Sequence, residues 1–304
     1  MIDERKLVKE KSILEILKEK ILIIDGAMGT MLQKNGLKSG DCPEAWNIEH
    51  PDIIKKIHTS YLEAGADIIL TNTFGANGVK LKKVKQDHRL VEINQQAAIL
   101  AKEAADDYIS KNNKSVFIAG SIGPTGEILE PCGDLTNKDA YEGYSKQVQE
   151  LVSAGVDLFI LETFYNLDEI KIALKAVKDH SDLVVFSSMT FDDNLKTIYG
   201  ISPEKAVESL FEEGSDGVGA NCGSGPEVLY KVLYKMREMT DAPLLVEPNA
   251  GVPYIENKKV IYPASPQEMA DYAEKFVKLK VNIIGGCCGT TPEHIKAISE
   301  RINK

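Results

Sequence analysis

The chain has 304 residues, of which 43% are hydrophobic and 27% are charged, and its formal net charge is −10. A chain of this length can bury a large core, and its negative charge disfavours binding to nucleic acid or to anionic membrane surfaces. No apolar run approaches the roughly 18 residues that a membrane helix needs. The composition therefore predicts a globular protein that binds neither nucleic acid nor membrane.

The N-terminal segment is charged throughout and has no apolar stretch of the kind found in signal peptides. Leu7, Ile13, Ile16 and Leu17 are placed on one face, which predicts a short amphipathic helix over residues 4–19 or so. The chain contains five cysteines, an odd number, and two of them are adjacent. This pattern favours reduced thiols in a cytoplasmic protein, used for metal binding or catalysis.

Short apolar runs recur along the chain and have the composition of parallel strands buried on both faces. They span residues 21–25, 66–73, 115–121, 156–163, 183–190, 215–222, 243–250 and 281–288. Segments with helical periodicity lie between them, including 51–66, 90–109 and 139–156. Eight strands that alternate with helices predict a single-domain (β/α)8 TIM barrel over residues 1–304. The alternative, an open doubly wound sheet, is disfavoured because no GxGxxG motif follows the first strand.

The active site of a (β/α)8 barrel lies at the C-terminal ends of its strands. The predicted strand ends are polar here and carry Asp25 with Gly26, Ala27 and Met28, then Thr71, Glu162, Asn221 with Cys222, Glu247, and Cys287 with Cys288. Three of the cysteines thus come from the sixth and eighth strands, which only one strand separates. We therefore expect their thiols to meet.

Three thiolates favour a soft, tetrahedral Zn²⁺ ion, and three protein ligands leave the fourth position open, as in catalytic zinc sites. Glycines around Cys287 and Cys288 permit a sharp turn that brings both sulfurs to one ion. Cys222, Cys287 and Cys288 are accordingly the predicted zinc ligands. Cys42 and Cys132 are interpreted as small buried hydrophobic residues.

Such an electron-rich zinc site is poorly suited to activating water but well suited to holding a substrate thiol as a nucleophilic thiolate. The predicted chemistry is therefore alkyl transfer to sulfur. Glu162 is costly to bury without a cation, and the ammonium of an amino-acid substrate would be a suitable partner. An alternative role for Asp25 is to cap a turn. An alternative role for Glu247 is structural, as a residue of the barrel.

Two further features have local interpretations. Thr291, Pro292 and Glu293 form the cap, first residue and first-turn acid of a helix, which places His294 on its surface. The basic cluster from Lys80 to Lys85 is interpreted as a solvated helix face.

Several motifs together resemble the homocysteine S-methyltransferase family over essentially the whole chain. Within this family, the likeness is greatest to the homocysteine-binding module of cobalamin-dependent methionine synthases. The motifs are DGAMGT (25–30), HPDIIKKIHTSYLEAGADIILTNTF (50–74), GSIGPTGE (120–127), GANCGSGP (219–226), EPNAG (247–251) and GGCCGTTPEHI (285–295). The resemblance implies a (β/α)8 barrel, homocysteine as substrate and zinc on the three cysteines. It also implies that Asp25 and Glu162 bind the amino-acid end of homocysteine, with contributions from the 25–30 backbone and Thr71. Asn221 and Glu247 complete the expected substrate-binding set.

The family divides by methyl donor. Betaine users resemble this chain up to Phe74, but they place another aromatic residue where it has Gly75, and a tryptophan where it has Cys42. The resemblance therefore favours methylcobalamin, supplied in trans by a corrinoid module or partner protein, because this chain contains no DxHxxG corrinoid motif. Two alternatives stay open: a stand-alone enzyme using S-methylmethionine or S-adenosylmethionine, and a non-catalytic thiol-binding or zinc-binding protein.

Overall fold

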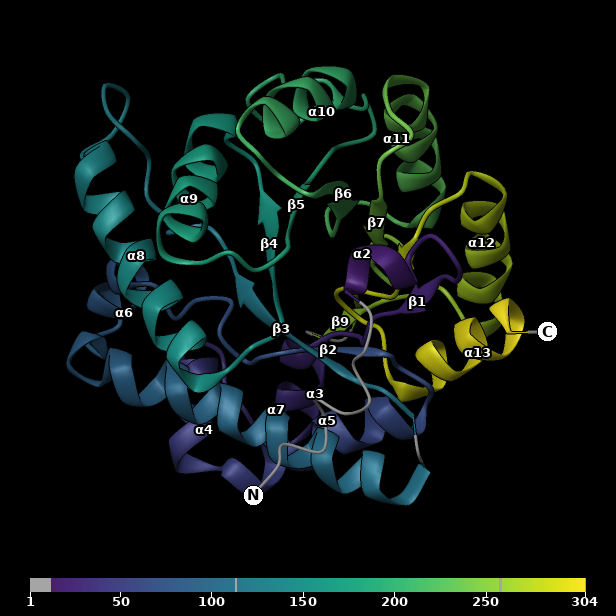
Figure 1. Ribbon diagram of the computed structural model, residues 1–304, viewed down its shortest axis with the longest axis horizontal. Coiled ribbons are helices and arrows are strands. Elements are labelled where there is room, and N and C mark those ends of the chain that lie inside the picture. The colour runs from purple at the N-terminus through teal and green to yellow at the C-terminus, as the bar shows by residue number, and fades with distance from the viewer. Residues whose placement is uncertain (1–11, 113, 257–258, 304) are drawn as a thin grey trace.

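A computed structural model describes residues 12–112, 114–256 and 259–303 of the chain, and its centre is a sheet of eight parallel strands. The strands follow the order β1-β10-β7-β6-β5-β4-β3-β2, and a parallel bridge between Ile24 and Ile68 brings the two edges together. Figure 1 shows the helices arranged around these strands. The predicted (β/α)8 barrel is therefore confirmed.

Each barrel strand overlaps one of the eight apolar runs of the sequence. The strands are β1 (Leu22–Ile23), β2 (Ile68–Leu70), β3 (Phe117–Ile122), β4 (Leu158–Phe164), β5 (Val185–Met189), β6 (Gly217–Asn221), β7 (Leu244–Glu247) and β10 (Ile283–Ile284). Nearly all their residues are buried, as expected of strands that pack on both faces.

The helices are capped largely by the residues that their sequences suggest. Asn166 caps α9 by accepting bonds from two N–H groups, and Gly155 ends α8 in the left-handed conformation at φ 86°. The α-helices are α2 (Ile13–Ile16), α3 (Met28–Lys34), α4 (Trp46–Glu49), α5 (Pro51–Glu63), α6 (Gly78–Lys83), α7 (Leu90–Asn112), α8 (Asn137–Ala154), α9 (Leu167–His180), α10 (Pro203–Glu212), α11 (Pro226–Met239), α12 (Pro266–Lys278) and α13 (Pro292–Ile302). Two 3-10 turns, η1 (Pro43–Ala45) and η2 (Asp87–Arg89), precede α4 and α7.

Among the described residues, no helix is long and apolar enough to span a membrane.

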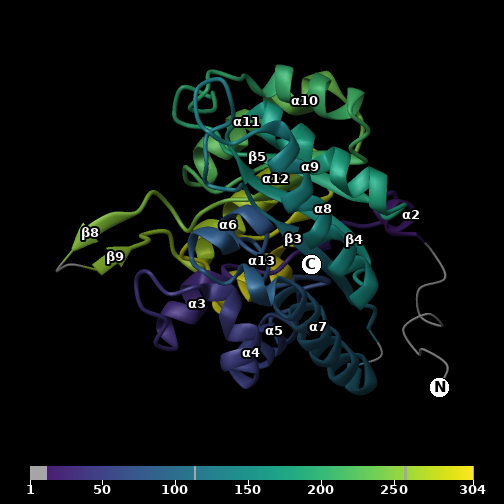
Figure 2. The same cartoon turned by 90° about the vertical axis from the view of Figure 1, so that its left-hand side faces the viewer.

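The N-terminal segment closes one end of the barrel. Ile13 and Leu17 pack in one cluster with inward-facing strand residues such as Leu22, Phe186 and Ile283. The predicted N-terminal helix is present here as the short α2, while its expected first residues, 4–11, lie outside the described part of the chain. Figure 2 shows that α2 lies at the end of the barrel opposite the β8–β9 hairpin.

A β-hairpin follows β7, and it was not predicted from the sequence. Strands β8 (Tyr254–Glu256) and β9 (Lys259–Ile261) pair antiparallel and project from the barrel (Figure 2). Ile255 is 79% exposed, so the hairpin lacks the buried apolar pattern of the barrel strands. Its base leads back to the site through Tyr262 and Ala264, because the Ala264 N–H donates to the Ala250 carbonyl.

Candidate active site and metal centre

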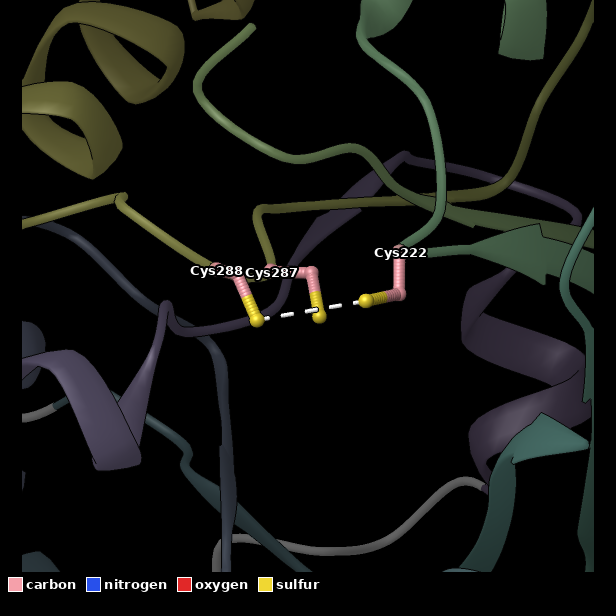
Figure 3. A group of neighbouring side chains, drawn as sticks. All are labelled: Cys222, Cys287 and Cys288. Atoms are coloured by element: carbon pink, nitrogen blue, oxygen red, sulfur yellow. Dashed lines mark hydrogen bonds between the residues drawn. The ribbon is translucent and has the colours of Figure 1, made fainter. Parts of the chain in front are cut away.

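The three predicted ligands meet at the C-terminal end of the barrel. Cys222 follows β6, Cys287 and Cys288 follow β10, and β7 lies between these strands. The loop after β7 joins the two sides, because the Cys287 N–H donates to the Pro248 carbonyl (2.8 Å) and the Ala250 N–H donates to the Cys288 carbonyl (2.9 Å). In Figure 3 the three sulfur atoms lie close together along the gap between the two strand ends.

The spacing of the sulfurs fits a tetrahedral zinc ion. All three Sγ atoms lie within 4.8 Å of one another, and those of Cys222 and Cys288 are 3.9 Å apart. Thiolates that each lie about 2.3 Å from a tetrahedral zinc are separated by about 3.8 Å. Cys222 reaches this position through a left-handed backbone at φ 57°, which a non-glycine residue rarely adopts. The donor set and its spacing therefore fit zinc.

The three cysteines are half-buried, and their thiols hydrogen-bond with one another. Hydrogen bonds with the Cys222 and Cys287 side chains, supported by one with Tyr262, lower the pKa of Cys288 to about 3. Hydrogen bonds with the Cys222 and Cys288 side chains, together with burial, raise the pKa of Cys287 well above its ordinary value. A cation at the centre of the three sulfurs would favour their thiolate forms.

Three further buried carboxyl groups lie at this end of the barrel, and two of them, Glu162 and Glu247, line the same cavity as the sulfurs. Asp25 Oδ2 accepts from the Leu70 N–H (3.0 Å), and Glu162 Oε1 accepts from the Ser121 hydroxyl (2.6 Å). Asp25 Oδ1 and Glu247 Oε2 have no hydrogen-bond partner among the described residues. Burial raises the pKa of Glu162 to about 7, and burial with repulsion between the acids raises those of Asp25 and Glu247 well above their usual range. A bound cation would relieve this cost.

The cavity between the sulfurs and the acids measures about 460 Å³, and among the residues that the structure describes no lysine, arginine or histidine lines it. Of the predicted residues, its lining includes Asp25's neighbours Gly26, Ala27 and Met28, then Thr71, Glu162, Cys222, Glu247, Cys287 and Cys288. Gly26 is required here, because a Cβ would lie 2.7 Å from the Thr290 hydroxyl oxygen. The structure therefore brings nearly all the predicted residues to one cavity.

Asp25 and Asn221 are the exceptions, because neither lines the cavity; the side chain of Asn221 bonds instead to neighbouring strands. Its Oδ1 accepts from the Thr163 N–H (2.8 Å) and the Ser188 hydroxyl (2.8 Å), and its Nδ2 donates to the Thr163 hydroxyl (2.7 Å). Nδ2 also lies 4.0 Å from the Cys287 sulfur. These contacts hold the Asn221 side chain against β4 and β5, and its contact with substrate stays a prediction.

Several interpretations from the sequence were wrong in detail. Cys132 is exposed, and Cys42 is only half-buried, with its thiol donating to Glu44 (3.3 Å). His294 is largely buried at the start of α13, where Nε2 bonds with the Ala264 carbonyl (3.0 Å). Lys80 is half-buried and lies over an aromatic ring at the site, unlike the solvated lysines that follow it.

Sequence reasoning also missed aromatic and acidic side chains around the cavity. Phe74, Tyr165 and Glu44 line it, and Glu44 Oε1 accepts from the Gly75 N–H (2.7 Å). Tyr165 follows β4 and Phe74 follows β2, so the strand-end rule that identified the cysteines would have found both. Glu44 lies in a 3-10 turn remote from any strand end, and no sequence signal marks it.

A barrel whose strand ends bring together three thiols and buried acids is built as an enzyme with a candidate metal centre. The sequence model of the homocysteine S-methyltransferase family matches residues 22–302. The chain therefore belongs to the homocysteine S-methyltransferase family.

Individual relatives agree with this assignment. The chain is 30% identical over 305 residues to the methionine synthases of Mycobacterium leprae and Mycobacterium tuberculosis, covering 96% of this chain and 25% of each relative. It thus spans about a quarter of the length of these curated relatives. Its structure resembles the metallated form of the homocysteine methyltransferase MmuM from Escherichia coli, with a TM-score of 0.80, 25% identity and coverage of 94% of this chain and 98% of that one.

Proposed function

We propose that this protein transfers a methyl group to the thiol of homocysteine, giving methionine, with a zinc ion held by Cys222, Cys287 and Cys288. The observation that carries the proposal is that three converging sulfurs and buried carboxyl groups border one cavity. Homocysteine carries a thiol and an ammonium on one short chain, so it can reach the metal ligands and the acids together. The metallated state of the MmuM relative supports a metal at this place.

The acids would bind the ammonium of the substrate. Glu162 and Asp25 are buried carboxyls whose ionisation is costly, and a cation between them would offset that cost. Thr71 and the residues from Gly26 to Met28 also border the cavity, and we place the substrate carboxylate against this part of the lining. Glu247 lines the same cavity with an oxygen, Oε2, that has no hydrogen-bond partner among the described residues, and we include it in the substrate site.

When bound, zinc would supply the positive charge that lowers the pKa of the substrate thiol and keeps its sulfur a thiolate. The protein's own part is to orient homocysteine, with its ammonium at the acids and its sulfur toward the mouth of the cavity. An electron pair of that sulfur forms the new bond to the methyl carbon. The pair of the breaking bond leaves with the donor, and no further co-reactant is needed.

The proposed donor is a methyl-corrinoid, methylcobalamin, carried by another module or by a partner protein. The resemblance to methionine synthases supports it, since these relatives extend well beyond the region matched here. A corrinoid macrocycle is much larger than the cavity and would have to be presented at its mouth. The five free cysteines agree with a reducing, cytoplasmic setting.

A second candidate is a stand-alone methyltransferase that uses S-methylmethionine or S-adenosylmethionine. The supporting observation is that this chain covers 98% of MmuM, itself a homocysteine methyltransferase. A third, non-catalytic thiol-binding or zinc-binding role predicts homocysteine binding without turnover.

The deciding experiment is to measure methionine formation by zinc-loaded protein and homocysteine with each donor supplied alone. Turnover with methylcobalamin supports the corrinoid proposal, whereas turnover only with a sulfonium donor supports the second candidate. Homocysteine affinity that does not depend on zinc would contradict the proposed role of the metal.

A further inference from the structure

The lining of the cavity contains an aromatic ring, one face of which already contacts a cation of the protein. Phe74 follows β2 and lines the cavity, and the ammonium of Lys80 lies over its ring, with Nζ 4.7 Å from the ring centroid. This is a cation–π contact, the interaction by which proteins also bind sulfonium and quaternary ammonium ligands. The ring that a cationic ligand would use therefore already has a cation of the protein on it.

The local backbone fixes Lys80 in this place. Asn77 caps α6, and its Oδ1 accepts from the Lys80 N–H (2.8 Å), so Lys80 lies in the first turn of the helix. Its aliphatic stem passes over Gly75, where an added Cβ would lie 3.0 Å from Cε and 3.1 Å from Cδ of the lysine. The same Cβ would lie 2.6 Å from Glu44 Oε1. The absence of a side chain at Gly75 is what makes room for the lysine.

The charge of Lys80 acts on the cavity. Burial raises the pKa of the Glu162 carboxyl, and attraction to the Lys80 ammonium lowers it. Within the described part of the chain, no basic residue lines the cavity and no ion pair is formed by the Lys80 ammonium. Its positive charge therefore acts on the Phe74 ring and on Glu162.

We propose that Lys80 determines donor specificity by occupying the face of Phe74 and so excluding cationic methyl donors from the cavity mouth. Sulfonium and quaternary ammonium donors carry a full positive charge beside the methyl group until it is transferred. Such a donor would have to displace the ammonium from the ring or lie next to it, and both arrangements are unfavourable. A neutral methyl donor meets no such barrier. This inference rests on the proposed methyl transfer and refines the class of its donor.

The first test needs no methyl transfer. Tetramethylammonium is titrated into zinc-loaded wild-type protein and into Lys80→Met, whose side chain has a similar length and no charge. We expect the variant to bind the cation about tenfold more tightly, because the substitution removes the lysine ammonium from the face of the ring. Lys82→Met, an exposed lysine on the same helix, is the matched control and should behave like wild type. Equal affinity in all three proteins, or an equal gain in both variants, overturns the proposal.

A double variant tests whether the Phe74 ring is the group that binds the cation. Adding Phe74→Leu to Lys80→Met should abolish the gain, because it removes the ring that binds the cation. If the gain persists, Phe74 is not the binding face and the proposal is wrong. Lys80→Gln repeats the test should the methionine variant fold poorly, as judged by its affinity for homocysteine.

The third arm compares donors. Lys80→Met should raise turnover with S-methylmethionine about tenfold relative to methylcobalamin, by the same removal of charge. An unchanged ratio between the two donors overturns the specificity role. If no donor supports turnover in any variant while the tetramethylammonium gain is present, the proposed function fails and the cation-excluding role of Lys80 at this mouth is supported on its own.

Discussion

Asn221 and Thr163 are joined by two hydrogen bonds that tie β6 to β4, one through the Thr163 N–H and one through its hydroxyl. Thr163 follows Glu162 directly, and Asn221 precedes Cys222 directly. Thr163 has a left-handed backbone at φ 62°, at the place where the register between β4 and β5 shifts. One amide side chain thus fixes a proposed substrate acid and a proposed metal ligand relative to each other.

We expect Asn221→Ala to damage both halves of the site. The substitution leaves the buried Thr163 N–H and the Ser188 hydroxyl without their acceptor, at a cost of about 2–4 kcal/mol in the free energy of unfolding. It should also weaken zinc and homocysteine binding, because Cys287 and Glu162 lose a common support. Urea unfolding and zinc titration measure the two effects. The exposed Asn194→Ala is the control, and a variant as stable as this control would show that the pair is unimportant.

The metal assignment predicts a difference among the cysteines. Cys222→Ser should lose most of its zinc, because a serine hydroxyl is a much weaker ligand for this ion than a thiolate. Cys132→Ser, an exposed thiol remote from the cluster, should keep about one zinc ion per chain, as expected of a single site. Metal analysis after dialysis measures both variants. Full zinc content in Cys222→Ser would remove Cys222 from the ligand set.

The barrel and the metal cluster were predictable because both depend on features that are local in the sequence. Buried parallel strands leave continuous apolar runs, and residues directly after them must gather at one end of the barrel. The role of Asn221 was not predictable, since its partners come from two other strands and only the folded chain shows that its amide is fully engaged. Lys80 was misread for the same reason: helical spacing does not reveal that Gly75 and Phe74 receive its side chain.

The pKa of Glu162 predicts how ligand binding depends on pH. Burial raises this pKa to about 7, so ionisation of Glu162 costs folding stability as pH rises from its ordinary value of 4.5 through about 7. A bound ammonium offsets that cost. Methionine, which has an ammonium but no thiol proton, should therefore bind about tenfold more weakly per pH unit below 7.

Calorimetric titration of zinc-loaded protein with methionine between pH 5.5 and 8, a range of about one unit or more on each side of that pKa, tests this dependence. Glu162→Gln should bind methionine weakly and with a much shallower slope. Glu130→Gln, at an exposed position, should retain the slope of the wild type. An affinity that stays level across the range in the wild type would mean that Glu162 does not bind the ammonium.

The closed end of the barrel predicts a change in stability that leaves binding untouched. Leu17 is only 5% exposed and packs with Ile13 against the inward-facing strand residues, and its carbonyl accepts from Asn282 Nδ2 (3.2 Å). Leu17→Ala should lower the free energy of unfolding by about 2–4 kcal/mol, through lost burial and the cavity left behind.

Leu17 directly follows α2, which lies at the end of the barrel opposite the β8–β9 hairpin (Figure 2). We therefore expect zinc stoichiometry and homocysteine affinity to equal those of the wild type in the folded variant. Lys18→Ala, at an exposed position in the same turn, controls for the loss of a long side chain and should leave stability within about 0.5 kcal/mol. Urea unfolding followed by circular dichroism gives the first quantity, and calorimetry gives the second. A stable Leu17→Ala variant would mean that the N-terminal segment covers the barrel without contributing to its core, and that the strands alone hold the interior closed.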